Sequence, residues 1–302
     1  MTTVDIDGHQ LKLSNLDKVL YPDDGFTKGQ VIDYYARIAP VAVPHYDGRH
    51  MTLKRYPNGV DDKFFFEKNS PKHRPDWVTV APFYSRHSKR QIDFTVIDSQ
   101  ATLVWTANLA AIELHPSLSL AVKPEQPTMV VFDLDPGAPA DIRQCCEVGL
   151  HLRELFDHLG LESFPKTSGS KGLQVYVPLN TPVTYDEPHG GTKGFALAVA
   201  QLLERQHPDL VVSNMAKDLR HGKILVDWSQ NDESKTTSGV YSLRAREHPT
   251  VSTPVTWGEV AQGVDDPLSV RFTADDVLAR VAEDGDLFRP TIELEQTLPS
   301  FG

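Results

Sequence analysis

The segment that most limits the fold is a short apolar run, residues 128–134 (TMVVFDL), which carries Asp133 near its end and is followed directly by Asp135. Four consecutive apolar residues before the acids favour a buried strand. Side chains two apart in a strand point to the same side, so Asp133 and Asp135 project together. Two neighbouring carboxylates at the edge of a core repel each other unless a cation lies between them. The pattern therefore predicts a core strand that ends at a divalent-metal site. The alternative is a solvated surface turn.

The rest of the chain predicts both strands and helices around this segment. Thr27 and Asp141 are suitable helix N-caps, whereas Pro40 and Gly160 are suitable stops. Such a mixture on one core indicates an α+β fold with mixed or antiparallel sheets flanked by helices. Further strands are expected at 172–179 and 223–229, and helices at 27–40, 101–114, 141–159 and 193–206.

Composition and charge narrow the classes of partner. The net charge is −11, and nine acids against three bases in residues 264–302 account for −6 of it, which leaves −5 for the rest. Any contact with nucleic acid must therefore rest on a few placed Lys and Arg side chains. No apolar run approaches the roughly 20 residues that span a bilayer, and the N-terminus does not resemble a signal peptide. The adjacent Cys145 and Cys146 suit a reduced, cytoplasmic protein.

A third acidic residue follows another apolar run. Asp227 comes directly after Ile224–Val226 in the strand expected at 223–229. If this strand is a neighbour of residues 128–134, its carboxylate completes a site for two metal ions roughly 3.5–4 Å apart. Taken alone, Asp227 is equally well explained as an acid at the end of a strand.

A Ser/Gly loop enters the strand expected at 172–179. It carries Ser168, Ser170 and Lys171 within residues 166–179 (KTSGSKGLQVYVPL). Successive backbone N–H groups in such a loop can form an anion-binding nest, and Lys171 adds a point charge. This suits a triphosphate, although the spacing is not that of a P-loop. A plain tight turn is the alternative.

A basic segment follows Asp227. Residues 234–247 (SKTTSGVYSLRARE) supply Lys235, Arg244 and Arg246. If Arg244 and Arg246 lie in a strand they share a face, and arginine offers bidentate contacts to phosphate. Ordinary surface bases are the alternative explanation.

Bases also lie beside aromatic residues in the N-terminal third. Phe64, Phe65 and Phe66 cannot all face one core from a strand, so at least one is expected to point outwards, where it can stack on a base. Lys18 and Lys28 are candidate phosphate contacts, the latter at a helix N-terminus that favours anions. Solvated surface lysines are the alternative explanation.

Taken together, these pieces resemble the polymerase domain of bacterial ligase D and its stand-alone relatives in actinobacteria. That family is a branch of the archaeo-eukaryotic primase superfamily. The resemblance implies the primase-type α+β fold and a DNA-dependent nucleotidyltransferase that fills short gaps or extends ends in DNA repair, with a preference for ribonucleotides. The blocks that carry it, in order, are NLDKVLYP, KRYPNG, FFEK, IELHP, FDLDPG, TSGSKGL, VDWSQN, KTT and YSLR.

The resemblance also implies roles for individual residues. Asp133, Asp135 and Asp227 match the metal-binding triad, which takes two Mn²⁺ or Mg²⁺ ions. The family usually has His where this chain has Gln174, and Gln donates a hydrogen bond but carries no charge. The other nucleotide-binding residues expected on this basis or from their local sequence are Lys54, His115, Ser168, Lys171, Lys235 and Arg244.

The remaining implied contacts are to DNA. Lys18 and Lys28 match the pocket for the 5′-phosphate of a gap, Phe65 and Phe66 match stacking aromatics, and Arg220 lies in a loop that handles DNA termini. Three portions follow: a DNA- and 5′-phosphate-binding portion at 1–125, a catalytic core at 126–260, and an acidic segment at 261–302.

The expected partners are gapped or broken DNA with a 5′-phosphate and NTP or dNTP. Because the chain has no K-x-D-G adenylation motif, a ligase is expected as a separate partner, together with a DNA end-binding protein. We expect a monomer without a membrane partner, located in the bacterial cytoplasm at the nucleoid.

Two other functions fit part of the pattern. A strand that ends in D-x-D also begins the haloacid-dehalogenase phosphatases, with Asp133 as nucleophile and Asp135 as acid/base. That family has Thr or Val two residues after the second Asp, where this chain has Gly137 within Pro-Gly-Ala. A non-catalytic factor that bridges DNA ends would use the N-terminal bases and aromatics but leave the three aspartates unexplained.

Overall fold

The computed structural model describes residues 2–86, 88–186 and 191–299, and the chain divides into two compact units. The first unit comprises Met1–Val122, Thr236–Ser252 and Phe272–Asp286, and the second comprises Lys123–Lys235, Thr253–Arg271 and Leu287–Gly302. The functional portions expected at 1–125, 126–260 and 261–302 remain a prediction.

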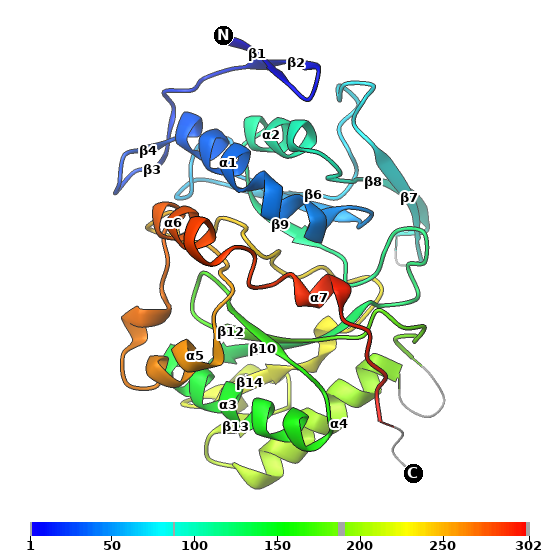
Figure 1. Cartoon of the computed structure of the whole chain (residues 1–302), viewed down its shortest axis with the longest axis vertical. Helices are drawn as coiled ribbons and strands as arrows, with labels where there is room; N and C mark the ends of the chain where they lie inside the picture. Colours follow the sequence, from blue (N-terminus) through cyan, green and yellow to red (C-terminus); the bar gives the residue numbers. More distant parts are fainter. Residues whose placement is uncertain (1, 87, 187–190, 300–302) are drawn as a thin grey trace. The chain divides into compact units, whose positions relative to one another are not determined.

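The second unit contains a five-stranded sheet in the order β11-β12-β10-β14-β13 (Figure 1). All neighbours are antiparallel except the parallel pair β13–β14, so the sheet is mixed, as expected. The strands are β10 (Met129–Pro136), β11 (Phe164–Thr167), β12 (Leu173–Pro178), β13 (Val211–Val212) and β14 (Ile224–Asp227).

One face of this sheet is covered by α3 (Ile142–His158) and α4 (Gly191–Gln206) (Figure 1). The ring of Phe132 on β10 lies 5.2 Å from that of Phe156 on α3 and 6.3 Å from that of Phe195 on α4. Because side chains alternate along a strand, Asp133 and Asp135 project from the opposite face. The apolar core thus fixes the side of the sheet on which the two carboxylates lie.

The helix predicted at 141–159 is confirmed. Asp141 is its N-cap and forms a capping box with Gln144, and Gly160 follows its end with a φ of +70°. The short helical elements of this unit are α5 (Trp257–Gly263), α7 (Pro290–Glu293), and the 3₁₀ turns η1 (Lys217–Arg220), η2 (Trp228–Gln230) and η3 (Pro267–Val270).

The first unit is built on a second five-stranded sheet. Its strands run in the order β6-β5-β8-β7, and β9 also pairs with β5. They are β5 (Met51–Arg55), β6 (Phe65–Glu67), β7 (Val80–Ser85), β8 (Arg90–Thr95) and β9 (Ala111–Pro116). Around them lie the hairpin pairs β1 (Thr2–Ile6) with β2 (His9–Leu13) and β3 (Val19–Tyr21) with β4 (Phe26–Thr27), and the helices α1 (Lys28–Tyr46), α2 (Gln100–Asn108) and α6 (Ala274–Asp284).

Helix α1 continues past the proline that was expected to stop it. Pro40 has no N–H to donate to the carbonyl of Ala36, which lies one turn earlier. The Gln100 amide on α2 donates to that carbonyl instead, at 2.7 Å. A partner from another helix thus replaces the lost bond, and the sequence of α1 alone does not reveal it.

The helix predicted at 101–114 is wrong in its second half. Helix α2 ends at Asn108, Ala110 takes a left-handed φ of +58°, and residues 111–116 form β9. The run is apolar on all sides because this strand is buried on both faces, a pattern that short buried helices share. In the described part of the chain, no helix is long and apolar enough to cross a membrane.

Candidate functional site

A row of polar side chains crosses four strands of the second unit's sheet. In register, Lys166 on β11 pairs with Gln174 on β12, Gln174 with Asp133 on β10, and Asp133 with Asp227 on β14. Cross-strand neighbours lie on the same face of a sheet, and Asp135 shares that face because it is two residues from Asp133. The sheet therefore gathers all three predicted carboxylates on the face opposite α3 and α4.

Hydrogen bonds run along this row. The Lys166 ammonium donates to the Gln174 amide oxygen at 2.6 Å, and the Gln174 amide nitrogen donates to Asp133 Oδ1 at 3.0 Å. The Tyr176 hydroxyl also donates to the Gln174 oxygen, at 3.2 Å. Lys166 and Gln174 are fully buried. Sequence analysis assigned no role to Lys166, although a lysine beside a Ser/Gly loop was a usable signal.

The charge of Asp133 is poorly compensated by the protein. Burial, followed by repulsion from Asp135, raises the pKa of Asp133 to about 7, although the Gln174 hydrogen bond and Lys166 oppose the rise. Asp227 adds to the repulsion. A carboxylate that holds its proton this tightly is one that a divalent cation would stabilise, and oxygen donors are the ligands that Mg²⁺ and Mn²⁺ prefer. The donor set therefore fits a hard divalent cation.

The carboxylates do not yet form a closed ligand set. Asp227 caps η2: its Oδ1 accepts from the Ser229 hydroxyl at 2.6 Å, and its Oδ2 accepts from the Gln230 amide at 2.8 Å. Within residues 2–86, 88–186 and 191–299, no three His, Cys, Asp or Glu side chains lie so as to hold a metal ion. The three aspartates lie on one face of the sheet, and their negative charge is not fully compensated there. A cation would have to draw them together.

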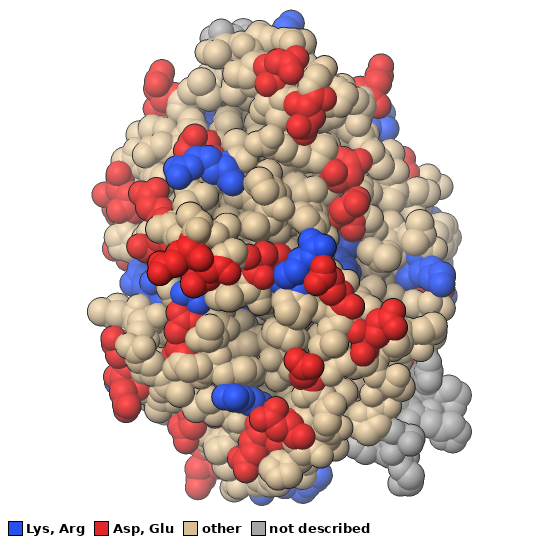
Figure 2. All heavy atoms as spheres, in the orientation of Figure 1, with Lys and Arg blue, Asp and Glu red and all other residues tan. Residues whose placement is uncertain are grey.

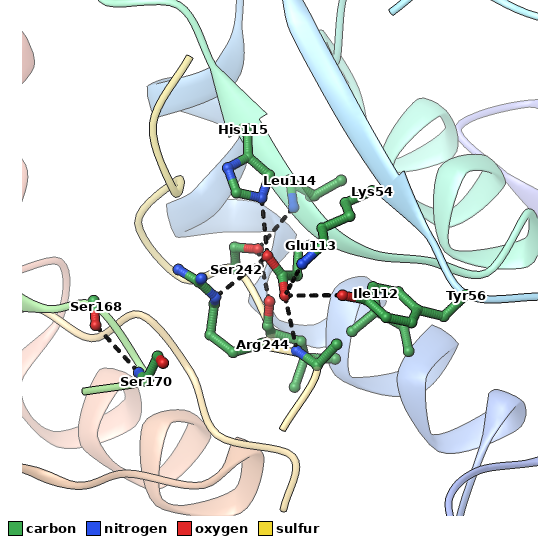
Figure 3. A network of polar contacts seen from close by, with 12 residues as sticks. Lys54, Tyr56, Ile112, Glu113, Leu114, His115, Ser168, Ser170, Ser242 and Arg244 are labelled. Atoms are coloured by element: carbon green, nitrogen blue, oxygen red, sulfur yellow. Dashed lines mark hydrogen bonds and ion pairs between the residues drawn. The ribbon is translucent and has the colours of Figure 1, made fainter. Parts of the chain in front are cut away.

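Some hydrogen-bonding groups of the Ser/Gly loop bond to each other within the loop. The Ser168 hydroxyl oxygen accepts from the backbone N–H groups of Ser170, at 3.2 Å (Figure 3), and Gly172, at 3.1 Å. Lys171 is exposed. The anion nest expected here is thus partly satisfied internally, and Lys171 is the outward charge of the loop.

Two glycines fix loops against this sheet. A Cβ on Gly172 would overlap the carbonyl oxygen of Leu134 on β10, so the Ser/Gly loop can lie this close only with glycine at that position. A Cβ on Gly137 would overlap the carbonyl oxygen of Arg220 in the same way. The segment with Arg220 therefore lies directly against the turn that follows Asp135. This contact could not be predicted from the sequence, in which the two segments are far apart.

In the first unit, one buried carboxylate gathers three of the predicted nucleotide contacts. Figure 3 shows Glu113 of β9 at the centre of a polar network. Its Oε1 lies 3.2 Å from Lys54 Nζ, and its Oε2 lies 3.0 Å from His115 Nε2 and 3.5 Å from Arg244 Nε. Glu113 is almost fully buried. Sequence analysis missed it, although an acid within the apolar run AIEL was a signal.

Glu113 and His115 differ in their charge at neutral pH. Burial alone would raise the pKa of Glu113, but the His115 hydrogen bond and the charges of Arg244 and Lys54 hold it well below its usual range. Burial lowers the pKa of His115, although Glu113 opposes this. At neutral pH the network therefore contains one carboxylate, two cations and a neutral imidazole.

Aromatic rings surround the ammonium of Lys54. Its Nζ lies 4.4 Å from the ring centre of Phe64, 5.2 Å from Tyr56 and 5.8 Å from Phe66. The side chains of Phe64, Phe65 and Phe66 are all exposed, at 50%, 43% and 57%. The sequence pattern predicted that at least one of the three phenylalanines is exposed, and in the structure all three are. They form a surface on which bases can stack.

Lys28 lies in a basic cluster. Its ammonium donates to the Ser14 carbonyl at 2.7 Å and is almost fully buried, and burial, with Lys18 and Arg55, lowers its pKa. The Lys18 ammonium donates to the Asn58 side chain at 2.8 Å. The backbone N–H groups of Lys28 and Gly29 are taken by loop carbonyls, so side chains rather than the helix N-terminus supply the anion site.

The basic segment after Asp227 is not a strand. Residues 244–248 form a turn, with Arg244 half-buried against Glu113 and Arg246 exposed, so these arginines do not share a face as expected. A hydrogen bond from the Arg246 N–H to the Arg244 carbonyl closes the turn. Lys235 is exposed in the second unit, where its N–H donates to the Asp232 carbonyl.

The drawn face of the molecule carries many acidic side chains with fewer basic ones between them (Figure 2). This agrees with the net charge of −11. Contact with a polyanion must therefore be local, as the composition predicted.

Comparison with known proteins decides the family. The model of the LigD primase-polymerase domain matches residues 27–288. The chain belongs to this family. The predicted resemblance is thus confirmed, and the family places the chain among the nucleotidyltransferases.

Individual relatives agree. The multifunctional non-homologous end joining DNA repair protein LigD of Mycobacterium tuberculosis H37Rv is 45% identical over 286 residues, which cover 92% of this chain and 36% of that protein. The bifunctional non-homologous end joining protein LigD of Bacillus subtilis is 32% identical over 277 residues, 91% of this chain and 43% of that protein. The chain thus spans well under half the length of these relatives.

A solved structure confirms the fold class. The polymerase domain of Mycobacterium tuberculosis ligase D, in complex with DNA, superposes with a TM-score of 0.85 and 42% identity. The match covers 95% of this chain and 99% of that one.

Proposed function

We propose that this chain adds nucleotides to DNA 3′ ends, filling short gaps or extending ends during the repair of broken DNA by end joining. The antiparallel register that sets Asp133 opposite Asp227, with Asp135 on the same face, is the observation that carries this proposal. A phosphatase would use Asp133 and Asp135 but leave Asp227 unexplained, and a factor that only bridges DNA ends would leave all three carboxylates unexplained.

The proposed cofactors are two divalent cations, Mn²⁺ or Mg²⁺, held by Asp133, Asp135 and Asp227. Bound there, such ions activate the primer 3′-hydroxyl and neutralise the leaving pyrophosphate. The protein's own contribution to this site is positional. Gln174 donates to Oδ1 of Asp133 and so orients this carboxylate, and Lys166 offsets part of the negative charge.

In the first unit, the proposed nucleotide contacts are Lys54, Arg244 and His115. Lys54 and Arg244 supply permanent positive charge for the triphosphate, and the neutral His115 supplies a hydrogen-bonding nitrogen. In the second unit, we assign nucleotide binding to Ser168, Lys171, Gln174 and Lys235, and we propose that ribonucleotides are the preferred substrates.

The proposed DNA contacts use the first unit's basic and aromatic features. Lys18 and Lys28 bind a 5′-phosphate, because their charges lie close enough for Lys18 to lower the pKa of Lys28, and an anion would relieve that repulsion. Phe65 and Phe66 stack on bases. Arg220 handles the terminus. A separate ligase and a DNA end-binding protein are the proposed partners.

The experiment is single-nucleotide incorporation into a gapped duplex with a 5′-phosphate, with NTP or dNTP and with Mn²⁺ or Mg²⁺. The wild-type chain should extend the primer, with NTP used better than dNTP, and Asp133→Ala should not extend it at all. Asp286→Asn, which alters a carboxylate that accepts from the Tyr241 hydroxyl and pairs with His45, is the control and should retain activity. Binding of DNA without incorporation by the wild type would favour an end-bridging role. Release of phosphate from a simple phosphoester would favour a phosphatase.

A further inference from the structure

The carboxylate of Glu113 is almost fully buried, yet every polar contact that it makes leads to a residue of the proposed nucleotide pocket or its support. Oε1 accepts from Lys54, from the Tyr56 hydroxyl at 3.4 Å and from the Ala245 N–H at 3.2 Å. Oε2 faces His115 and Arg244. Lys54, His115 and Arg244 come from three separate segments of the chain, and in the described network Glu113 is the group that all three share.

We propose that Glu113 is a positioning residue, which holds Lys54 and Arg244 together against their mutual repulsion and fixes His115 in one tautomer, ready for a nucleoside triphosphate. This inference rests on the proposed function for the nucleotide itself, but the tautomer claim stands on the geometry alone.

The tautomer follows from hydrogen-bond chemistry. An ionised carboxylate only accepts, and Glu113 is ionised at neutral pH because its pKa is held low. His115 Nε2, at 3.0 Å from Oε2, must therefore carry the hydrogen. The imidazole is neutral at this pH, so Nδ1 is left as an acceptor. The ring can then accept a hydrogen bond from a hydroxyl of the nucleotide, which an imidazolium cannot do.

The charges of the network leave it with a net positive charge. Lys54 and Arg244 contribute +2 and Glu113 contributes −1, so the network retains a net +1 to attract a triphosphate. Glu113→Gln would raise that attraction, but the new amide N–H₂ would face the guanidinium of Arg244, which can only donate. Opposed buried donors cost more than one added charge gains, because a buried donor without an acceptor loses its full desolvation energy. The variant is therefore expected to bind nucleotide more weakly.

The first measurement is the ¹⁵N NMR signature of His115, which needs no nucleotide. The wild type at pH 7 should show a protonated Nε2 and an unprotonated Nδ1. In Glu113→Gln, the Gln amide donates towards Nε2, so the ring should switch to the Nδ1–H form. A structural role alone would not move the tautomer. A wild-type spectrum with the hydrogen on Nδ1 would overturn the proposal even if the variant does not fold.

The second measurement is the affinity for a nucleoside triphosphate and its KM in gap filling. Glu113→Gln should raise KM by about tenfold and change kcat by less than about threefold, the pattern of lost substrate positioning. Glu113→Asp, which keeps the charge, should recover part of the affinity. Asp286→Asn is the matched control, because it alters a partly buried carboxylate with a His and a Tyr partner in the same unit, and it should leave KM unchanged.

The outcomes separate the two claims. If the wild type neither binds nor incorporates nucleotide but shows the Nε2–H tautomer, the proposed function fails and the positioning role within the network stands. If incorporation is normal and Glu113→Gln leaves both the tautomer and KM unchanged, the proposed function stands and the role of Glu113 is refuted.

Discussion

The amide of Gln174 bridges Lys166 and Asp133: its oxygen accepts from Lys166 at 2.6 Å, and its nitrogen donates to Asp133 at 3.0 Å. The lysine thereby sets which way the amide faces. Lys166→Met removes the donor that holds the amide oxygen and so frees the amide to turn its oxygen towards Asp133. We expect Mn²⁺ affinity to fall by about tenfold, a typical effect of removing such outer support. Tyr176→Phe, which removes only the weaker bond to the same oxygen, should have a smaller effect. Isothermal titration with Mn²⁺ measures both, and unchanged affinity in Lys166→Met would refute the bridge.

The pKa of Asp133 predicts how the stability of the metal-free protein depends on pH. Folding raises this pKa from near 3.8 to about 7, so the folded state binds the proton more tightly than the unfolded chain does. The resulting stabilisation is complete below about pH 4 and is lost as pH rises through 7. At about 1.4 kcal/mol per pKa unit, the loss is at most a few kcal/mol. Melting curves with EDTA between pH 4 and 8 should show it, and Asp133→Asn should flatten the trend. An equal slope in that variant would contradict the assignment.

How much of this site the sequence could predict depends on the length scale of each interaction. The pair Asp133 and Asp135 was predictable, because strand alternation is local. The pairing of Asp133 with Asp227 depended on the order of strands in the sheet, which the separate apolar runs do not contain. The bridging role of Gln174 depended on Lys166 lying in register on a third strand. The residues next to Gln174 in the sequence do not indicate this pairing with Lys166.

Lys28 should matter only for DNA that carries a 5′-phosphate. Its pKa is lowered by burial and by Lys18 and Arg55, and a phosphate beside these three charges would relieve their repulsion. Lys28→Met is expected to weaken binding of a 5′-phosphorylated gap by about tenfold, the value of one charge-assisted contact. Binding of the unphosphorylated gap should not change. Lys12→Met, at an exposed position on β2, is the control. Equal losses on both DNAs, measured by fluorescence anisotropy, would remove the 5′-phosphate assignment.

Gly172 should tolerate no side chain. A Cβ there overlaps the Leu134 carbonyl oxygen, so Gly172→Ala must push the Ser/Gly loop away from β10. We expect a loss of about 1–3 kcal/mol in the free energy of unfolding, the usual result of overpacking, and a higher KM for the nucleotide. Gly194→Ala, in the exposed face of α4 with open space around it, should instead stabilise the protein slightly. Denaturant unfolding of both variants tests the pair, and equal stability would contradict the close approach.

Two helix predictions were wrong because residues far away in the sequence determine the local structure. Pro40 was expected to end α1, but Gln100 takes over the carbonyl that the proline leaves without a donor. Residues 111–114 were expected to be helical, but pairing with β5 makes them a strand. That strand carries Glu113, so the same error concealed the network around it.

The most direct test of the central claim is a count of bound Mn²⁺ by EPR titration, in the presence of a non-hydrolysable nucleoside triphosphate. Two ions should bind the wild type. Asp133→Ala and Asp227→Ala should each lose at least one ion, because these residues face each other across β10 and β14. The Asp286→Asn control should bind two Mn²⁺ ions, as the wild type does. If the two alanine variants retain the full complement of Mn²⁺, the three carboxylates do not hold the metal, and the proposed catalytic mechanism is wrong.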